Sequence, residues 1–260
     1  MPFADSLAAQ YIVLRSSWER MGKYEEQVAR GLTILRGLNL DIPLELEPSP
    51  SSIMDAMAYS SSIASKYSID QITKLRGGKV DERKKNILLS LNSIVTGASW
   101  SSSPFLPLIT CAVVNYSLQN GVYEESALSF ACLGYFKIAL LGDYKEGRYW
   151  ANATKEILKK SDTSVAGSRA RIMLYGFVKC WYVSLRETGS NLLSINNRTV
   201  AMGDVKSSIS STLFSLRCSF YSGENLPLLL KSHCELLRIM VSDFICFVTR
   251  NLGIQLIYLV

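Results

Sequence analysis

The chain has 260 residues, of which 48% are hydrophobic, and its 28 basic and 22 acidic residues give a net charge of +6. This hydrophobic content lies above the range of disordered chains, and the length suffices for one large domain with a sizeable core. The positive charges are spread thinly along the sequence, whereas nucleic-acid-binding proteins concentrate them in a patch or stripe.

Residues 1–40 predict an N-terminal helical hairpin. Gly22 is expected to end its first helix, for which Asp5 is the expected N-cap. Apolar residues recur at helical spacing on both sides of that glycine, at Leu7, Tyr11, Leu14, Trp18, Tyr24, Val28, Leu32 and Leu35. Residues 41–80 contain three prolines and a Gly-Gly pair, and therefore predict a linker with short helices, one of them around Ile53–Tyr67.

From residue 81 to residue 260 the helical period of the apolar residues becomes regular. Pairs of helices begin near Asp81, Glu124, Ser164 and Val205, at intervals of about forty residues that are typical of helical repeats. No run of alternating β-branched residues indicates a strand. The sequence therefore predicts an all-α fold, a right-handed solenoid of helical hairpins that is continuous over residues 81–260.

Three details of these helices are specific enough to test. Ser103 is expected to cap a helix that has Pro104 at its first position, where a missing N–H is tolerated. One helix is expected to span Val165–Leu185. In the last pair, Phe220 is expected to lie on the apolar stripe that packs against Leu226, Leu230 and their neighbours.

The clearest hairpin is Glu124–Lys160. Its first helix is apolar almost all round and its second carries a single apolar stripe, so the pair needs further helices to cover it. A Gly-Asp-Tyr corner joins the two helices, and small residues on both are expected to let them approach closely. The residues that shape this hairpin are Gly134, Gly142, Asp143, Tyr144, Gly147 and Ala151.

This pattern, from Leu133-Gly134 through Gly142-Asp143-Tyr144 to Ala151, resembles a degenerate tetratricopeptide repeat (TPR). Together with Gly22-Lys23-Tyr24 and the later FYSGENLP segment, it resembles the helical-repeat region that follows a predicted AAA-type ATPase in large signalling proteins with serine/threonine kinase, GAF and histidine kinase modules. The resemblance implies TPR-like hairpins, a chain that is a fragment of a longer protein, and a protein partner in the ATPase or kinase region of the same parent polypeptide.

No motif predicts a catalytic, cofactor or metal site. Gly77-Gly78-Lys79 lacks the spacing of a phosphate-binding loop, and the single histidine, His233, lies on an apolar stripe where a core or semi-buried position is expected. The six cysteines are isolated within apolar segments, which is typical of buried free thiols in a reducing compartment. We therefore expect no cofactor and no enzymatic activity.

The function expected from these patterns is protein binding by a regulatory solenoid. Lys137, Arg171 and Lys179 stand on otherwise apolar first helices, where they are expected to orient a bound protein. Two alternatives remain open: a helical enzyme or small-ligand domain with a pocket between helices, and a nucleic-acid-binding helical repeat.

The ends of the chain favour a cytoplasmic protein. The N-terminus lacks the features of a signal peptide. Charged residues interrupt the apolar tract Ile239–Val260 and argue against a membrane span. The uncapped apolar residues from Ile254 to Leu259 predict self-association of the isolated chain.

Overall fold

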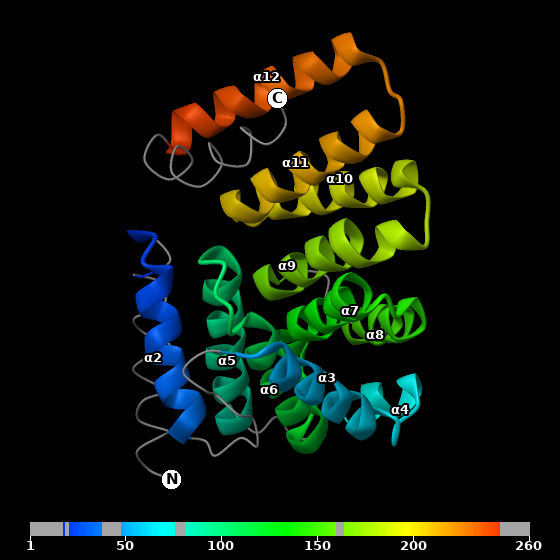
Figure 1. Ribbon diagram of the computed structural model, residues 1–260. Helices are drawn as coiled ribbons and strands as arrows, with labels where there is room; N and C mark the ends of the chain where they lie inside the picture. The colour runs from blue at the N-terminus through cyan, green and yellow to red at the C-terminus, as the bar shows by residue number, and fades with distance from the viewer. Residues whose placement is uncertain (1–17, 19–20, 38–47, 76–81, 160–163, 245–260) are drawn as a thin grey trace. The chain divides into compact units, whose positions relative to one another are not determined.

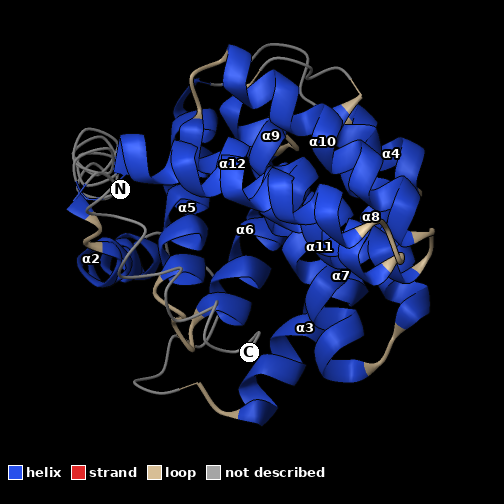
Figure 2. Ribbon diagram, turned by 90° about the horizontal axis from the view of Figure 1, so that it is seen from above, coloured by secondary structure: helices blue, strands red, loops and turns tan. Residues whose placement is uncertain are grey.

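The computed structural model describes residue 18 and residues 21–37, 48–75, 82–159 and 164–244. Within these ranges the regular elements are helices and none is a strand (Figure 2), which confirms the predicted all-α class. The chain divides into two compact units, residues 1–178 and residues 179–260, so that the boundary falls inside the predicted repeat region. Each unit is described by itself.

The first unit is a bundle of helices in which α6 lies deepest. Every residue of α6 from Leu108 to Leu118 is buried, and the helix packs against α3, α5 and α7. A helix covered on several sides is expected where polar residues form no continuous stripe. The elements of this unit (Figure 1) are α2 (Tyr24–Gly37), α3 (Pro50–Ala64), α4 (Ile69–Lys74), α5 (Glu82–Trp100), α6 (Leu106–Asn120), η1 (Glu124–Ser126), α7 (Ala127–Leu141), α8 (Tyr144–Leu158), α9 (Val165–Met173) and the π-helical η2 (Leu174–Val178).

The N-terminal α2 is fixed to α5 by a buried polar contact. The amide nitrogen of Gln27 donates to the carbonyl oxygen of Ser93 over 2.8 Å and reaches its hydroxyl over 2.9 Å. Before α2, Gly22 has a φ of +69°, and this left-handed conformation fits its predicted role as a helix stop. The rest of the predicted first helix, including its Asp5 cap, lies outside the described residues apart from Trp18 and Met21.

The short helices of residues 41–80 belong to the core of the first unit. Ser49 accepts a hydrogen bond from the backbone N–H of Ser52 and thereby caps α3, with Pro50 in the first turn. The side chains of Met57 on α3 and Ile72 on α4 are fully buried, and the two helices pack against α6 and α8 respectively. A linker that only connects elements would not bury such residues, so α3 and α4 are an integral part of the bundle.

The predicted start of α6 is wrong by a few residues. Ser102 has a φ of 52°, and the N–H of Ser103 bonds back to the carbonyl of Ala98, so Ser103 closes α5. Its hydroxyl also accepts from the N–H of Phe105 over 3.4 Å and its carbonyl from the N–H of Leu106 over 3.1 Å, so the predicted cap forms on the single turn that precedes α6. The helix α6 then begins at Leu106 with Pro107 in its first turn, where Pro104 was expected.

The expected single helix Val165–Leu185 is also wrong. The helix α9 ends at Met173, a π-helical and a 3₁₀ segment follow, and α10 begins only after Ser184. The hydroxyl of Ser184 accepts from the N–H of Glu187 over 3.1 Å, so the Ser-x-x-Glu sequence starts a new helix. This local capping signal overrides the apolar period that runs through the segment.

The second unit is built around a tight helical hairpin. Its elements are η3 (Lys179–Trp181), α10 (Leu185–Ala201), α11 (Val205–Tyr221) and α12 (Leu226–Phe244). The backbone of Gly189 approaches α11 so closely that an added Cβ would lie 3.3 Å from Cβ of Cys218, and the Ser215 hydroxyl donates to the Gly189 carbonyl over 2.9 Å. Asp204 caps α11 after the left-handed Gly203.

Candidate functional site

The corner between α7 and α8 has the conformation that its sequence predicts. Gly142 ends α7 with a φ of 65°, and the side chain of Asp143 accepts from the N–H of Glu146 over 2.9 Å to cap α8. Tyr144, the first residue of α8, is exposed. The corner is therefore fixed by backbone conformation and capping, independently of any ligand.

The small residues of the hairpin bring the two helices together. A Cβ added to Gly134 would lie 3.1 Å from Cβ of Trp150 and 3.3 Å from the carbonyl oxygen of Gly147. Ala151 and Trp150 are both buried, and the Trp150 ring packs edge-on against Phe130. The close approach therefore makes room for the tryptophan side chain within the core.

Lys137 does not lie on a partner-binding surface, so its predicted role in orienting a bound protein does not fit the structure. Its side chain is only 5% exposed and forms an ion pair with Glu146 of α8 at 2.5 Å. A buried ammonium group needs such a partner because desolvation otherwise disfavours its charge. The ion pair thus joins a buried lysine to a partly exposed glutamate within the first unit.

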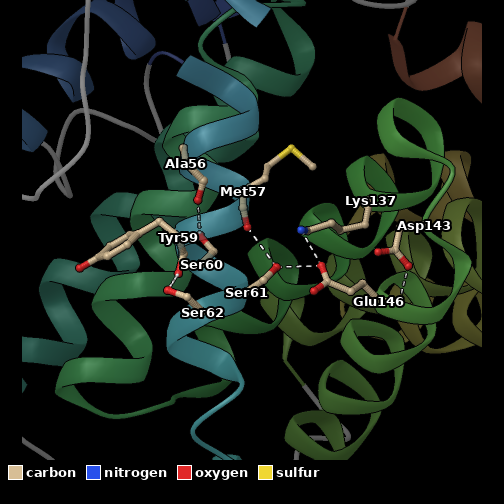
Figure 3. A network of polar contacts seen from close by, with 9 residues as sticks. All are labelled: Ala56, Met57, Tyr59, Ser60, Ser61, Ser62, Lys137, Asp143 and Glu146. Carbon is tan, nitrogen blue, oxygen red and sulfur yellow. Dashed lines mark hydrogen bonds and ion pairs between the residues drawn. The ribbon is translucent and has the colours of Figure 1, made fainter. Parts of the chain in front are cut away.

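The same carboxylate also holds α3. The hydroxyl of Ser61 donates to Oε2 of Glu146 over 2.7 Å and lies 3.0 Å from the carbonyl oxygen of Met57. Figure 3 shows Lys137 and Ser61 approaching Glu146 from different helices, while Asp143 caps the start of the same helix. The Glu146 carboxylate thus connects α3, α7 and α8. It neutralises the Lys137 ammonium group and accepts the hydrogen bond of the Ser61 hydroxyl.

A second polar contact between α8 and α3 lies one helical turn further along. The phenol oxygen of Tyr149 lies 3.2 Å from the carbonyl oxygens of both Ala64 and Tyr67, at the C-terminal end of α3. The Ala64 carbonyl also accepts from the backbone N–H of Tyr67 over 2.9 Å, so the phenol adds a contact from α8 to the turn that follows α3. Burial, and next the negative charge of Glu146, raise the pKa of Tyr149 above its usual value.

We expect Tyr149→Phe to lower the free energy of unfolding by about 1 kcal/mol, because the hydrogen bond from the half-buried phenol to the end of α3 is lost. Since the folded-state pKa of Tyr149 is raised above 10.0, the stabilisation by the neutral phenol is complete below pH 10 and disappears as pH rises through that pKa. Urea unfolding of both proteins at neutral and alkaline pH measures this difference. Tyr59→Phe, at an exposed position of α3, is the control. A difference that grows with pH would contradict the assignment.

The other two residues expected to orient a partner lie in different settings. The guanidinium of Arg171 donates to the carbonyl oxygen of Leu158 over 3.0 Å and so caps the end of α8 from α9. Lys179 is half-buried at the start of η3. Lys137 and Arg171 thus each have a partner within the first unit, whereas Lys179 belongs to the second.

The cysteine predictions are confirmed in part. Cys111, Cys132 and Cys218 are buried and free, whereas Cys234 is exposed, against expectation. Burial raises the pKa of Cys111 to about 11 and that of Cys132 to about 12, so both thiols are protonated at neutral pH and unreactive as nucleophiles. Cys246 lies outside the described residues.

The corner between α11 and α12 presents an apolar surface that was not expected. Gly223, with a φ of +78°, turns the chain, and the Phe220 and Tyr221 rings contact each other edge to face at 5.4 Å. We call the following five residues, each between 55% and 67% exposed, the α11–α12 corner surface: Phe220, Tyr221, Leu226, Leu228 and Leu230. Three of them, Phe220, Leu226 and Leu230, were predicted to pack between the two helices, but only Leu229 of this leucine run is buried there.

Neither polar contact of α3 was predicted from the sequence. Glu146 lies off the single apolar stripe predicted for its helix, and no contact with α3 was predicted for Ser61 or Tyr149. The sequence contains one signal for the ion pair. Lys137 and Glu146 lie at similar distances along the sequence on either side of the Gly142-Asp143 corner, and such residues face each other in an antiparallel hairpin.

His233 is semi-buried, as predicted, and its Nδ1 lies 3.2 Å from the carbonyl oxygen of Leu229. Over the described part of the chain, no three or more His, Cys, Asp or Glu side chains are grouped as metal ligands would be. The same residues include no helix with the length and apolar character needed to cross a membrane. Comparisons with protein-family models, with characterised proteins and with solved structures found no match.

Proposed function

We propose that the chain is a non-catalytic protein-interaction module of TPR-like hairpins, stacked as a right-handed solenoid, and a regulatory segment of an ATPase-linked signalling protein. The observation that carries the proposal is the α11–α12 corner surface. Its five exposed apolar side chains flank one turn, and exposed apolar groups mark interaction sites; fully burying one leucine contributes about 1.5–3 kcal/mol. Several such residues at one corner provide the apolar centre of an interface.

The chemistry of this surface favours a protein partner over a nucleic acid. Its members are leucines and aromatic residues, and the turn that they flank carries the exposed acidic Glu224. Nucleic-acid binding instead depends on lysine and arginine contacts to phosphates. The choice of an ATPase or kinase region of the parent polypeptide as the partner rests on the family resemblance alone.

The experiment replaces Leu228 by a photo-crosslinking amino acid in cells and identifies the captured protein by mass spectrometry. The captured protein is then purified and titrated against the unmodified chain. We expect Leu228→Lys to weaken this binding by at least about tenfold, because a charge replaces a leucine that the interface buries.

Val200→Lys is the matched control. Val200 is 60% exposed near the end of α10, by the opposite end of α11 and ~25 Å from the corner surface at ~1.5 Å per residue. Its substitution should leave the affinity unchanged. Equal capture at positions 200 and 228, or equal losses from the two lysine variants, would refute the proposed surface. Turnover of a small molecule by the purified chain would refute the non-catalytic role.

A further inference from the structure

The helix α2 lies at the outer edge of the first unit, beside α5 (Figure 1). Among the elements that the structure describes, α5 is the one against which α2 packs extensively. The helix α5 itself also packs against α6, η1 and α7. Release of α2 would therefore break its contact with α5 and leave in place the neighbours that hold α5 in the bundle.

The contact between the two helices is specific in shape and in polar groups. A Cβ on Gly31 would lie 2.7 Å from Cδ1 of Ile94, which is closer than a van der Waals contact, so the residue that faces Ile94 has to be glycine. One turn away, a Cβ on Gly97 would lie 3.2 Å from Cγ of Gln27. The amide nitrogen of Gln27 donates to the carbonyl oxygen of Ser93 over 2.8 Å.

An aromatic contact completes the pairing of α2 with α5. The Tyr24 ring, only 5% exposed, stacks on the Trp100 ring with centroids 6.1 Å apart and an angle of 21° between the planes. The contact residues of α2 follow one face of the helix, because they are spaced by three and four positions. We call the residues that they meet the α2-binding face of α5: Ser93, Ile94, Gly97 and Trp100.

A second copy of the chain carries the same helix and therefore fits the α2-binding face equally well. Exchange of an identical element between two copies is a low-cost route to a dimer, because the contacts of the monomer are formed again between the copies. The twelve residues 38–49 separate α2 from α3 in the sequence. At ~3.3 Å per residue they reach at most ~40 Å, which exceeds the length of α2 of ~21 Å.

We infer that the α2-binding face of α5 takes α2 of a second copy, so that two chains form a symmetric dimer by exchanging this helix. The dimer forms by mass action as the protein concentration rises. The α2-binding face is separate from the α11–α12 corner surface, and the exchange does not depend on the proposed function.

The test mixes two full-length variants, Gln27→Cys labelled with nitrogen-15 and Gly97→Cys without label, and oxidises the mixture with glutathione disulfide. The close contact of these two positions places the new thiols within reach of a disulfide. Since each substitution is on a different chain, a disulfide between positions 27 and 97 forms only when α2 has been exchanged. We expect mass spectrometry to find this labelled–unlabelled crosslink, with a yield that rises with concentration. Arg30→Cys, at an exposed position of α2, is the matched control and should give no crosslink to position 97.

A second measurement needs no mixing of variants. The double variant Gln27→Cys/Gly97→Cys, oxidised in dilute solution, ties α2 to α5 of its own chain and should lose the ability to dimerise on concentration. Size-exclusion chromatography with light scattering compares it with the wild-type chain, for which we expect a species of twice the monomer mass. A dimer that persists in the crosslinked double variant, or no interchain crosslink at any concentration, would overturn the inference.

Discussion

Replacing Glu146 by glutamine is expected to lower the free energy of unfolding by about 3 kcal/mol. The substitution leaves the Lys137 ammonium group, whose side chain is 5% exposed, without its counter-charge. Removing one partner of a buried ion pair typically costs about 3–5 kcal/mol, and the lower end applies here because the Glu146 side chain is 34% exposed. Urea unfolding followed by circular dichroism measures the change.

The matched control lies on the same helix. Glu156 forms an ion pair with Lys159 at 2.7 Å, but the lysine is 59% exposed, so Glu156→Gln should cost less than about 1 kcal/mol. The double variant Lys137→Met/Glu146→Gln should recover most of the loss, since no charge remains buried without a partner. If Glu146→Gln costs no more than Glu156→Gln, the buried ion pair does not stabilise the fold.

The single variant Glu146→Gln should also act locally on α3. Glutamine retains an acceptor for Ser61 but a weaker one than a carboxylate, so hydrogen exchange of α3 amides is expected to quicken more than that of α5 amides. Uniform quickening across the first unit would show that the carboxylate stabilises the bundle without a specific link to α3.

Gly134→Leu is expected to destabilise the first unit by about 1–2 kcal/mol. A Cβ at this position already meets the Trp150 Cβ at 3.1 Å and the Gly147 carbonyl oxygen at 3.3 Å, and a backbone atom has little freedom to move. Overpacking of this kind costs about 1–3 kcal/mol, whereas the higher helix propensity of leucine returns only about 0.5–1 kcal/mol. The cost of overpacking therefore exceeds the gain in helix propensity, and the variant is less stable than the wild-type chain.

The control for this prediction is Lys159→Leu, at the exposed end of α8. It adds leucine outside the close contact of the two helices and should change the urea midpoint little. Both variants should keep the slope of the unfolding transition, since the same surface is exposed on unfolding. Equal shifts of the midpoint would mean that Gly134 does not mark the close approach of α7 and α8.

The sequence by itself determined the helices and most of their ends. Helical periodicity and the absence of strand patterns give the all-α class, and these signals are local, within one or two turns. The same holds for the Gly142-Asp143 corner, where a left-handed glycine and a capping aspartate act on the adjacent backbone. The errors in the start of α6 and over Val165–Leu185 arose where two local signals competed. In the first, the end of α5 competes with the start of α6, and in the second, a capping serine competes with an apolar period.

Only the tertiary structure decided which polar groups are buried and which apolar groups are not. Lys137 is a charged residue of a type usually found at the surface. Its burial depends on the ion pair with Glu146 across the corner and on the covering helix α3. Conversely, Leu228 has the character of a core residue and remains exposed. Burial is a property of what packs against a residue, and those contacts join segments as distant in sequence as Ser61 and Glu146.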